Sequence, residues 1–229
     1  MTKVFMNLNT QELVKKVYDP YPDSPREWDN LGTLYTWEDR CYSPDKHNYP
    51  ESLDFLSELL TEETVYKVHD KYNNTHDFLE DIMKRLDKIG YILFPVYKYE
   101  HGLVRYGLGT SSGWDSGTVG VIFASKKKIY QEFKVKRITK EIRNKVVKLF
   151  EGELETYTDY ANGEVYGYIV ESFDGTEIDS CYGFYNFDMT INDVNDYFGL
   201  SDFDNWKEYN QEEIDEKFYI YNKTIVESR

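Results

Sequence analysis

Two aromatic β-type runs, Glu164 to Phe173 and Glu177 to Phe184, are separated by the dipeptide Asp174-Gly175. Asp-Gly favours a tight hairpin turn, because both residues adopt positive φ values at low cost. The two runs therefore predict an antiparallel hairpin. Hairpins in place of regular βαβ crossovers favour an α+β fold over a parallel doubly wound one.

Other segments predict further strands and helices around this hairpin. Three more β candidates are Tyr91 to Glu100, Leu103 to Leu108 and Thr118 to Ala124, with a turn at His101-Gly102. Leu13, Val14 and Val17 suggest a short helix over Thr10 to Tyr18. Further helices are expected after four N-cap candidates and over two acidic C-terminal segments. They are the helices after Ser52, Asn74 or Thr75, and Thr139, and those over Thr190 to Phe198 and Glu212 to Phe218.

We therefore expect an α+β protein with a mainly antiparallel sheet, an N-terminal helical segment and short acidic C-terminal helices. Its 229 residues admit a single domain. Subdomains are also possible, with residues 1–90 helical, 91–185 forming the sheet-containing core and 186–229 forming an acidic segment.

Charge is distributed unevenly along the chain, whose net charge is −15. Residues 124–148 contain ten basic and two acidic side chains, whereas residues 149–229 contain four basic and twenty acidic ones. Such asymmetry indicates interaction partners more than it indicates a reaction.

The N-terminal residues contain no apolar run of signal-peptide length, and no stretch approaches the about 20 apolar residues of a membrane span. Cys41 and Cys181 are too few for a disulfide framework, so reduced thiols are the simplest reading. These features predict a cytoplasmic protein without a membrane partner.

Candidate catalytic residues are few, and an enzyme is not the favoured class. His101 at a turn and Asp115 in the glycine-rich segment 113–120 could meet at one sheet edge, the minimum for general-base chemistry. Segment 113–120 lacks the spacing of a P-loop or a nucleophile elbow, so a turn entering a strand is expected. The pairs His69-Asp70 and His76-Asp77 lack an accompanying E-x-x-H, and no metal or cofactor is predicted.

The basic segment from Lys126 to Lys148 has two interpretations. Lysines interleaved with Tyr130 and Phe133 could contact nucleic-acid phosphates. The net negative charge of the chain opposes this unless the basic segment occupies a face of its own. Pairing of these lysines with the protein's own acids is the favoured interpretation, and direct nucleic-acid binding is not expected.

The acidic C-terminal third mixes carboxylates with aromatic rings. A solvated, solubilising face is one explanation of this composition. A rigid carboxylate array beside aromatic hot-spot residues could instead occupy a basic groove built for phosphates. The predicted binding residues are Glu153, Glu155, Asp159, Asp193, Asp196, Asp202, Asp204, Trp206 and Tyr209.

Four groups of residues together form a recognisable combination. They are Pro25 to Thr33, His101-Gly102 with Trp114 to Gly120, Glu153 to Tyr168, and Asp179 to Phe184. This combination resembles a family of small uncharacterised proteins encoded by phages and mobile elements of Gram-positive bacteria. The resemblance covers about Pro25 to Tyr185 and implies a phage context. It makes candidate site residues of Trp28-Asp29-Asn30, His101, Trp114-Asp115 and Asp179-Ser180.

These observations lead to two functional hypotheses. The first is an accessory protein of a phage or mobile element, of the anti-restriction or anti-CRISPR type, in the cytoplasm of the bacterial host cell. It would bind and inhibit a host nucleic-acid-handling defence protein through an acidic, aromatic-rich surface. Its partner would have a basic nucleic-acid-binding groove. The alternative is a small-ligand-binding protein or hydrolase-like enzyme with a loop cluster around Asp29, His101, Asp115 and Asp179.

Overall fold

The computed structural model describes residues 4–38, 41–186, 188–210, 212–218 and 220. Helices and two antiparallel sheets are both present, which confirms the α+β class. The chain forms two compact units, the first from residues 1–23 and 163–229 and the second from residues 24–162. These units do not follow the boundaries at residues 90 and 185 that the sequence suggested.

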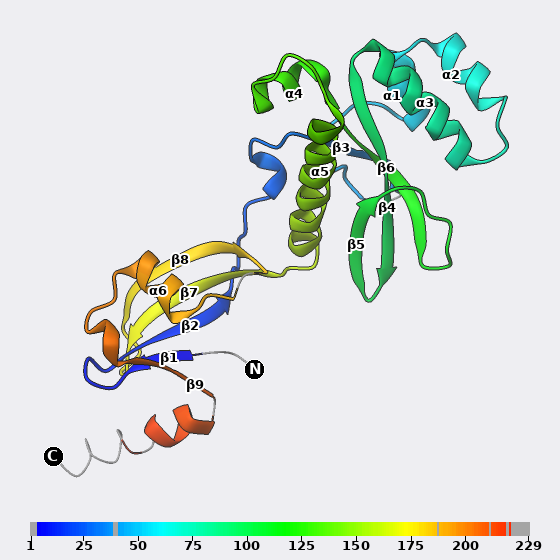
Figure 1. Cartoon of the computed structure of the whole chain (residues 1–229). Helices are drawn as coiled ribbons and strands as arrows, with labels where there is room; N and C mark the ends of the chain where they lie inside the picture. The colour runs from blue at the N-terminus through cyan, green and yellow to red at the C-terminus, as the bar shows by residue number, and fades with distance from the viewer. Residues whose placement is uncertain (1–3, 39–40, 187, 211, 219, 221–229) are drawn as a thin grey trace. The chain divides into compact units, whose positions relative to one another are not determined.

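The first unit contains a five-stranded antiparallel sheet of order β8-β7-β2-β1-β9 (Figure 1). Its N-terminal strands lie in the middle, beside strands from the other end of the chain. The predicted hairpin is confirmed, because β7 and β8 pair on either side of Asp174-Gly175. Elements of this unit are β1 Val4–Asn7, β2 Glu12–Tyr18, β7 Val165–Ser172, β8 Glu177–Tyr185, α6 Ile191–Phe198, the 3-10 helix η2 Phe203–Asn205 and β9 Trp206–Tyr209, followed by helical residues 212–218.

The helix predicted over Thr10 to Tyr18 is wrong, because this segment contains strand β2. Both faces of the strand are buried. Val14 packs with Val194 of α6, whereas Leu13 packs in a second cluster with Ile214 from the helical residues 212–218. Apolar residues are therefore consecutive in this strand. The sequence lacks the alternation of apolar and polar residues that identifies a half-buried strand, and this is why a helix was predicted.

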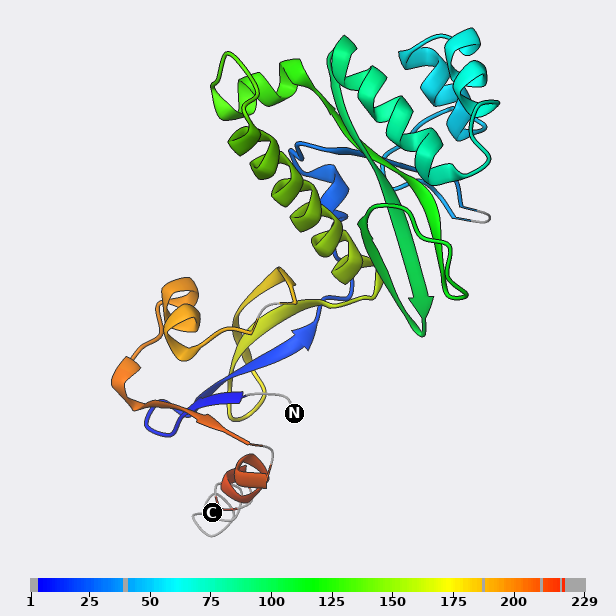
Figure 2. The same cartoon turned by 45° about the vertical axis from the view of Figure 1, so that its right-hand side comes forward.

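The second unit contains a four-stranded antiparallel sheet of order β3-β6-β4-β5. Figures 1 and 2 show α5 on one face of this sheet and α1 to α3 on the other. Its elements are the 3-10 helix η1 Pro25–Glu27, β3 Thr33–Thr36, α1 Ser52–Leu59, α2 Glu62–His69, α3 Thr75–Ile89, β4 Tyr91–His101, β5 Leu103–Leu108, β6 Ser116–Ser125, α4 Lys126–Phe133 and α5 Lys140–Ala161.

Alternate residues of the central strands divide between two cores. Ile92 and Ile122 pack with Phe150 of α5, and Val121 packs in the cluster formed by α1 to α3. Caps predicted at Asn74 and Thr139 are confirmed, since both side chains accept a hydrogen bond from the first helical turn. At α1 the N-cap is Glu51, one residue before the predicted Ser52.

Strand β5 is at the edge of its sheet, and the end of α5 covers this edge. The Asn162 amide accepts from Val104 N and donates to Val104 O, both at 2.9 Å, and Thr158 Oγ1 accepts from Tyr106 N at 3.0 Å. These bonds satisfy backbone groups that an uncovered edge would present to another chain. Among the described residues, no helix is long and apolar enough to cross a membrane.

Candidate functional site

His101 and Asp115 lie side by side, as their positions in the sequence suggested. His101 is the last residue of β4, and Asp115 directly precedes β6. The backbone N–H of Glu100 donates to Asp115 O at 2.8 Å, which places the two side chains together. His101 Nδ1 is 3.4 Å from Asp115 Oδ2, and the two side chains are 75% and 48% exposed. The two side chains therefore form a solvated contact at the end of the sheet.

The glycine-rich segment is a turn that leads into β6, as predicted. Ser116 Oγ lies 2.6 Å from Ser111 Oγ and accepts from Gly113 N at 3.2 Å. Ser116 therefore holds the loop closed. Trp114, between these anchors, is fully exposed to solvent. A large aromatic side chain presented by a hydrogen-bonded loop is typical of a binding anchor.

The four-residue alternative site is only partly assembled by the second unit. His101 and Asp115 contact each other, and Asp29 is exposed after η1. Asp179 is an exposed residue of β8, which belongs to the first unit. General-base chemistry requires a positioned nucleophile or water in an environment that shifts the pKa of the base. The side chains of His101 and Asp115 are exposed to solvent, and this contact alone carries no proposal of catalysis.

A cleft of about 620 Å³ lies between the β4–β5 hairpin and the C-terminal half of α5. Glu151, Glu155 and Asp159 contribute acidic groups to its lining, at four-residue intervals along the helix. His101 and Arg105 contribute to the opposite wall. Two predicted binding residues, Glu155 and Asp159, therefore share a cleft with the predicted His101.

Glu153 belongs to the interior of the second unit, which corrects its assignment to a binding surface. Its side chain is 11% exposed and accepts hydrogen bonds from Leu31 N at 2.8 Å and Gly32 N at 3.1 Å. Arg26 NH1 donates to it at 3.1 Å, and Arg26 NH2 donates to Asp45 at 2.7 Å. Glu153 thus fastens the loop before β3 to α5.

Arg26 is the centre of this network, with a side chain only 3% exposed. Burial alone would lower the pKa of its guanidinium group. Hydrogen bonds and charges from Asp45 and Glu153 outweigh burial and raise the pKa. The charges of this network therefore pair with one another inside the second unit.

The remaining predicted carboxylates belong to the first unit, on α6 and on the turn that leads to β9. We call Asp193, Asp196, Asp202 and Asp204 the acidic segment. Thr190 is the N-cap of α6, and Asp193 is the third residue of the helix. Asp193 accepts from Thr190 Oγ1 at 2.6 Å, and this bond lowers the pKa of its carboxyl group. Asn205 donates to Asp202 at 2.8 Å, and this bond is the main cause of a lowered pKa at Asp202. Both groups are held in place and ionised at neutral pH.

Trp206 is a core residue, which corrects its assignment as an interface aromatic. It is 5% exposed, packs with Phe5 and Val14, and donates from Nε1 to Ser201 O at 2.9 Å. Tyr209 is half-buried in the other cluster of the same sheet. Burial of these rings follows from β9 being a sheet strand, which the sequence did not predict.

Tyr197 is an exposed aromatic residue of α6, next to Asp196 of the acidic segment, and the sequence analysis did not select it. It is 60% exposed, and its ring packs edge-on against Phe184 with centroids 5.2 Å apart. Ile191, Val194 and Phe198 form the buried stripe of α6. Tyr197 lies off that stripe, so helical periodicity could have identified it.

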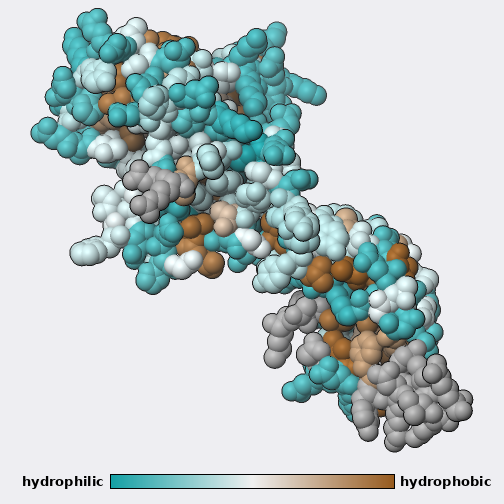
Figure 3. All heavy atoms as spheres, turned by 180° about the vertical axis from the view of Figure 1, so that it is seen from behind, coloured by the Kyte–Doolittle hydropathy of each residue, from teal (hydrophilic) through white to brown (hydrophobic). Residues whose placement is uncertain are grey.

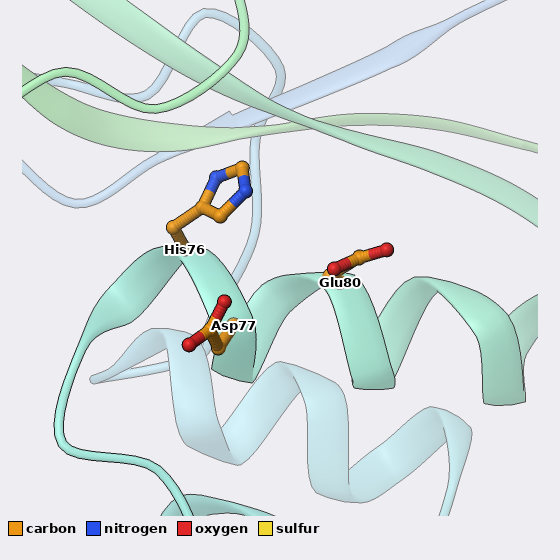
Figure 4. A group of neighbouring side chains, drawn as sticks. All are labelled: His76, Asp77 and Glu80. Carbon is orange, nitrogen blue, oxygen red and sulfur yellow. The ribbon is translucent and has the colours of Figure 1, made fainter.

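One group of side chains has the spacing of a cation site. Ligand atoms of His76, Asp77 and Glu80 lie within 4.8 Å of one another at the start of α3 (Figure 4). Each is already engaged. His76 Nδ1 is 3.2 Å from Thr110 Oγ1, Asp77 accepts from Asn74 at 2.9 Å, and Glu80 pairs with Lys84 at 2.7 Å. The group is solvated, and His69 is not part of it.

A cavity of about 980 Å³ lies beside this group. Trp37, Phe55 and Phe78 give it apolar walls, and His76 and Ser111 give it polar ones. Comparison with protein-family models, with curated proteins and with solved structures finds no match for the chain.

Proposed function

We propose that this protein is an accessory protein of a phage or mobile element that binds and inhibits a host nucleic-acid-handling defence protein. The observation that carries the proposal is the partition of charge between the two units. The first unit contains 19 acidic and 7 basic residues, a net charge of −12, whereas the second has a net charge of only −3. A small, strongly anionic unit is suited to a groove that is complementary to phosphates.

The acidic segment supports this proposal in its detail. Hydrogen bonds fix Asp193 and Asp202, and a fixed carboxylate loses little side-chain entropy when it meets a cation. Asp196, Asp204 and the aromatic Tyr197 are exposed beside them. Anchored charges with an exposed aromatic ring are the composition expected of an interface that competes with nucleic acid.

The proposal predicts protection of an incoming phage. We would express the protein in a bacterial host with an active restriction or CRISPR system and measure the plating efficiency of a sensitive phage. Protection of tenfold or more is expected. The variant Asp196→Asn/Asp204→Asn/Glu212→Gln removes three exposed charges from the first unit and should abolish most of the protection.

A matched control removes the same charge from the second unit. Glu58→Gln/Glu62→Gln/Glu63→Gln changes three exposed residues, one on α1 and two on α2. This control should protect as well as the wild type does. Equal protection by both variants would contradict a role for the acidic first unit, and absence of protection against every defence system tried would contradict inhibition.

A further inference from the structure

In the second unit, α4 and the start of α5 lie together at one end of the sheet (Figures 1 and 2). Six exposed cations of these two helices and of the loop between them form what we call the basic ridge. Among the residues that the structure describes, none of the six has an ion pair. They are Lys127, Lys134, Lys136, Arg137, Lys140 and Lys148.

Other cations of the same sequence segment are used by the fold, as the favoured interpretation expected. Lys126 and Arg143 both pair with Asp87, the latter at 2.5 Å, and Lys145 pairs with Glu141 at 3.0 Å. Lys128 donates to the backbone oxygen of Asn30. The prediction that the basic residues pair with the protein's own acids is therefore right for Lys126, Arg143 and Lys145, and it does not extend to Lys128 or to the ridge.

Helix stability does not explain the ridge. Lys127 lies in the first turn of α4, and Lys140 lies in the first turn of α5. A cation there is disfavoured by the helix dipole, by about 0.3–1 kcal/mol at exposed positions. The two acids of this region give little compensation, because Glu141 already pairs with Lys145 and Glu132 has no ion pair among the described residues.

The division of charge between units removes the main objection to an anionic partner. That objection was the net charge of −15, most of which belongs to the first unit. Hydrophilic residues cover the end of the second unit that carries α4 (Figure 3). Electrostatic attraction of a polyanion depends on the local field within about one Debye length, roughly 8–10 Å in physiological salt.

We infer that the basic ridge binds the phosphate backbone of nucleic acid without reading its sequence. Lys140 and Lys148 are about 12 Å apart along α5, which corresponds to about three phosphates of one strand. Tyr130, exposed on α4 between Lys127 and Lys134 in the sequence, offers a ring that can pack on a sugar or base. The chemistry is that of lysine and arginine side chains that neutralise phosphates and release counterions.

The test is fluorescence anisotropy of the full chain with a labelled 20-base-pair DNA duplex and with one of its single strands. Micromolar binding at 50 mM NaCl is expected. Affinity should fall about 10³-fold at 200 mM if all six cations contact phosphates. The ridge variant Lys136→Gln/Arg137→Gln/Lys140→Gln should reduce the slope of log affinity against log salt by about 3.

A charge-matched control distinguishes the ridge from net charge. Lys67→Gln/Lys88→Gln/Arg105→Gln removes two lysines and one arginine that are exposed elsewhere in the second unit. Its affinity for DNA should stay within twofold of the wild type. Far-ultraviolet circular dichroism of both variants establishes that they are folded.

Two results would overturn the inference. One is an unchanged anisotropy at 50 mM NaCl, or an equal loss of affinity in the ridge variant and the control. The other is salt-sensitive dimerisation in analytical ultracentrifugation, lost in the ridge variant, with no DNA binding. That result would assign the ridge to the anionic first unit of a second copy of this chain.

Discussion

The two units of this protein use acidic residues in opposite ways. In the first unit, Asp196 and Asp204 are exposed and have no ion pair among the described residues. In the second unit, Glu153 and Asp45 surround a buried arginine, and Asp87 joins α3 to α4 and α5 through Lys126 and Arg143. The same residue types therefore supply surface charge in one unit and internal connections in the other.

The difference shows that charge is informative only after it has been assigned to a folded unit. Glu153 and Glu155 are two residues apart on α5, yet the first is nearly buried and the second is exposed in a cleft. Removal of a charge should accordingly cost stability at the Arg26 and Asp87 networks of the second unit, and interaction at the exposed Asp196 and Asp204 of the first. Three substitutions test this comparison, in order of decreasing effect.

Substitution of Arg26 should have the largest effect. Arg26→Met leaves Glu153 and Asp45 without their cation inside the second unit, and breaking a buried pair in this way costs about 3–5 kcal/mol. Thermal unfolding should show a lowered Tm. Hydrogen exchange should accelerate in β3 and α5, and the strands of the first unit should keep their wild-type exchange rates.

Arg26→Lys is the control for this prediction. It keeps the charge but loses the paired hydrogen bonds that the guanidinium group donates to Asp45, at 2.7 and 3.2 Å. Its stability should lie between those of Arg26→Met and the wild type. A wild-type Tm for Arg26→Met would show that the network is not an internal connection.

Local structure with its own chemical signal could be predicted from the sequence. Asp174-Gly175 specifies a turn, and Asn74 and Thr139 cap helices, regardless of what packs on them. Strands β2 and β9 could not be predicted, because they are defined by pairing across the chain: β1 pairs with β9 and β2 pairs with β7. Trp206 was misassigned to a surface for this reason.

The part of the site that could be predicted is the contact between two residues at the same end of neighbouring strands. His101 and Asp115 end adjacent segments of the same sheet, so their contact followed from the strand order. Burial of Glu153 depends on a loop more than 120 residues earlier in the chain, whose backbone N–H groups need an acceptor. The sequence contains no local signal for that need.

Substitution of Asn7 should show how much a buried polar side chain contributes to the stability of the first unit. Asn7 is fully buried, accepts from Asn9 N at 2.9 Å and donates to Asp202 O at 3.0 Å. Asn7→Ala removes the hydrogen bonds that its side chain makes with Asn9 N and Asp202 O, at a cost of about 1–3 kcal/mol in the free energy of unfolding. Trp206, the one tryptophan in the sequence of this unit, reports unfolding by its fluorescence.

Asn9→Ala is the matched substitution, since exposed Asn9 donates to the same Asp202 side chain at 3.0 Å. We expect it to change the free energy of unfolding by less than about 0.5 kcal/mol, because water can replace a solvated hydrogen bond. Equal losses in the two variants would mean that the buried position of Asn7 contributes nothing.

Asp87 should show the smallest effect and a specific dependence on pH. Burial alone would raise the pKa of its carboxyl group, but Arg143 and Lys126 outweigh burial and hold the pKa below its usual value. A carboxyl group with a lowered pKa in the folded state stabilises the protein above its unfolded pKa of about 3.9, and this contribution is lost as the pH falls through the folded value. Because these side chains are 25–40% exposed, Asp87→Asn should cost only about 0.5–1 kcal/mol at pH 7.

The stabilities of Asp87→Asn and the wild type should approach each other as the pH falls below the unfolded pKa and through the lowered folded pKa of Asp87, because its carboxyl group then becomes uncharged. Denaturant unfolding at pH 7, 5 and 3 measures the difference. Asp196→Asn in the first unit is the comparison, and it should match the wild type at all three pH values because the described residues give Asp196 no ion pair. A pH-dependent loss at Asp196, or none at Asp87, would break the distinction between surface charge in the first unit and connecting charge in the second.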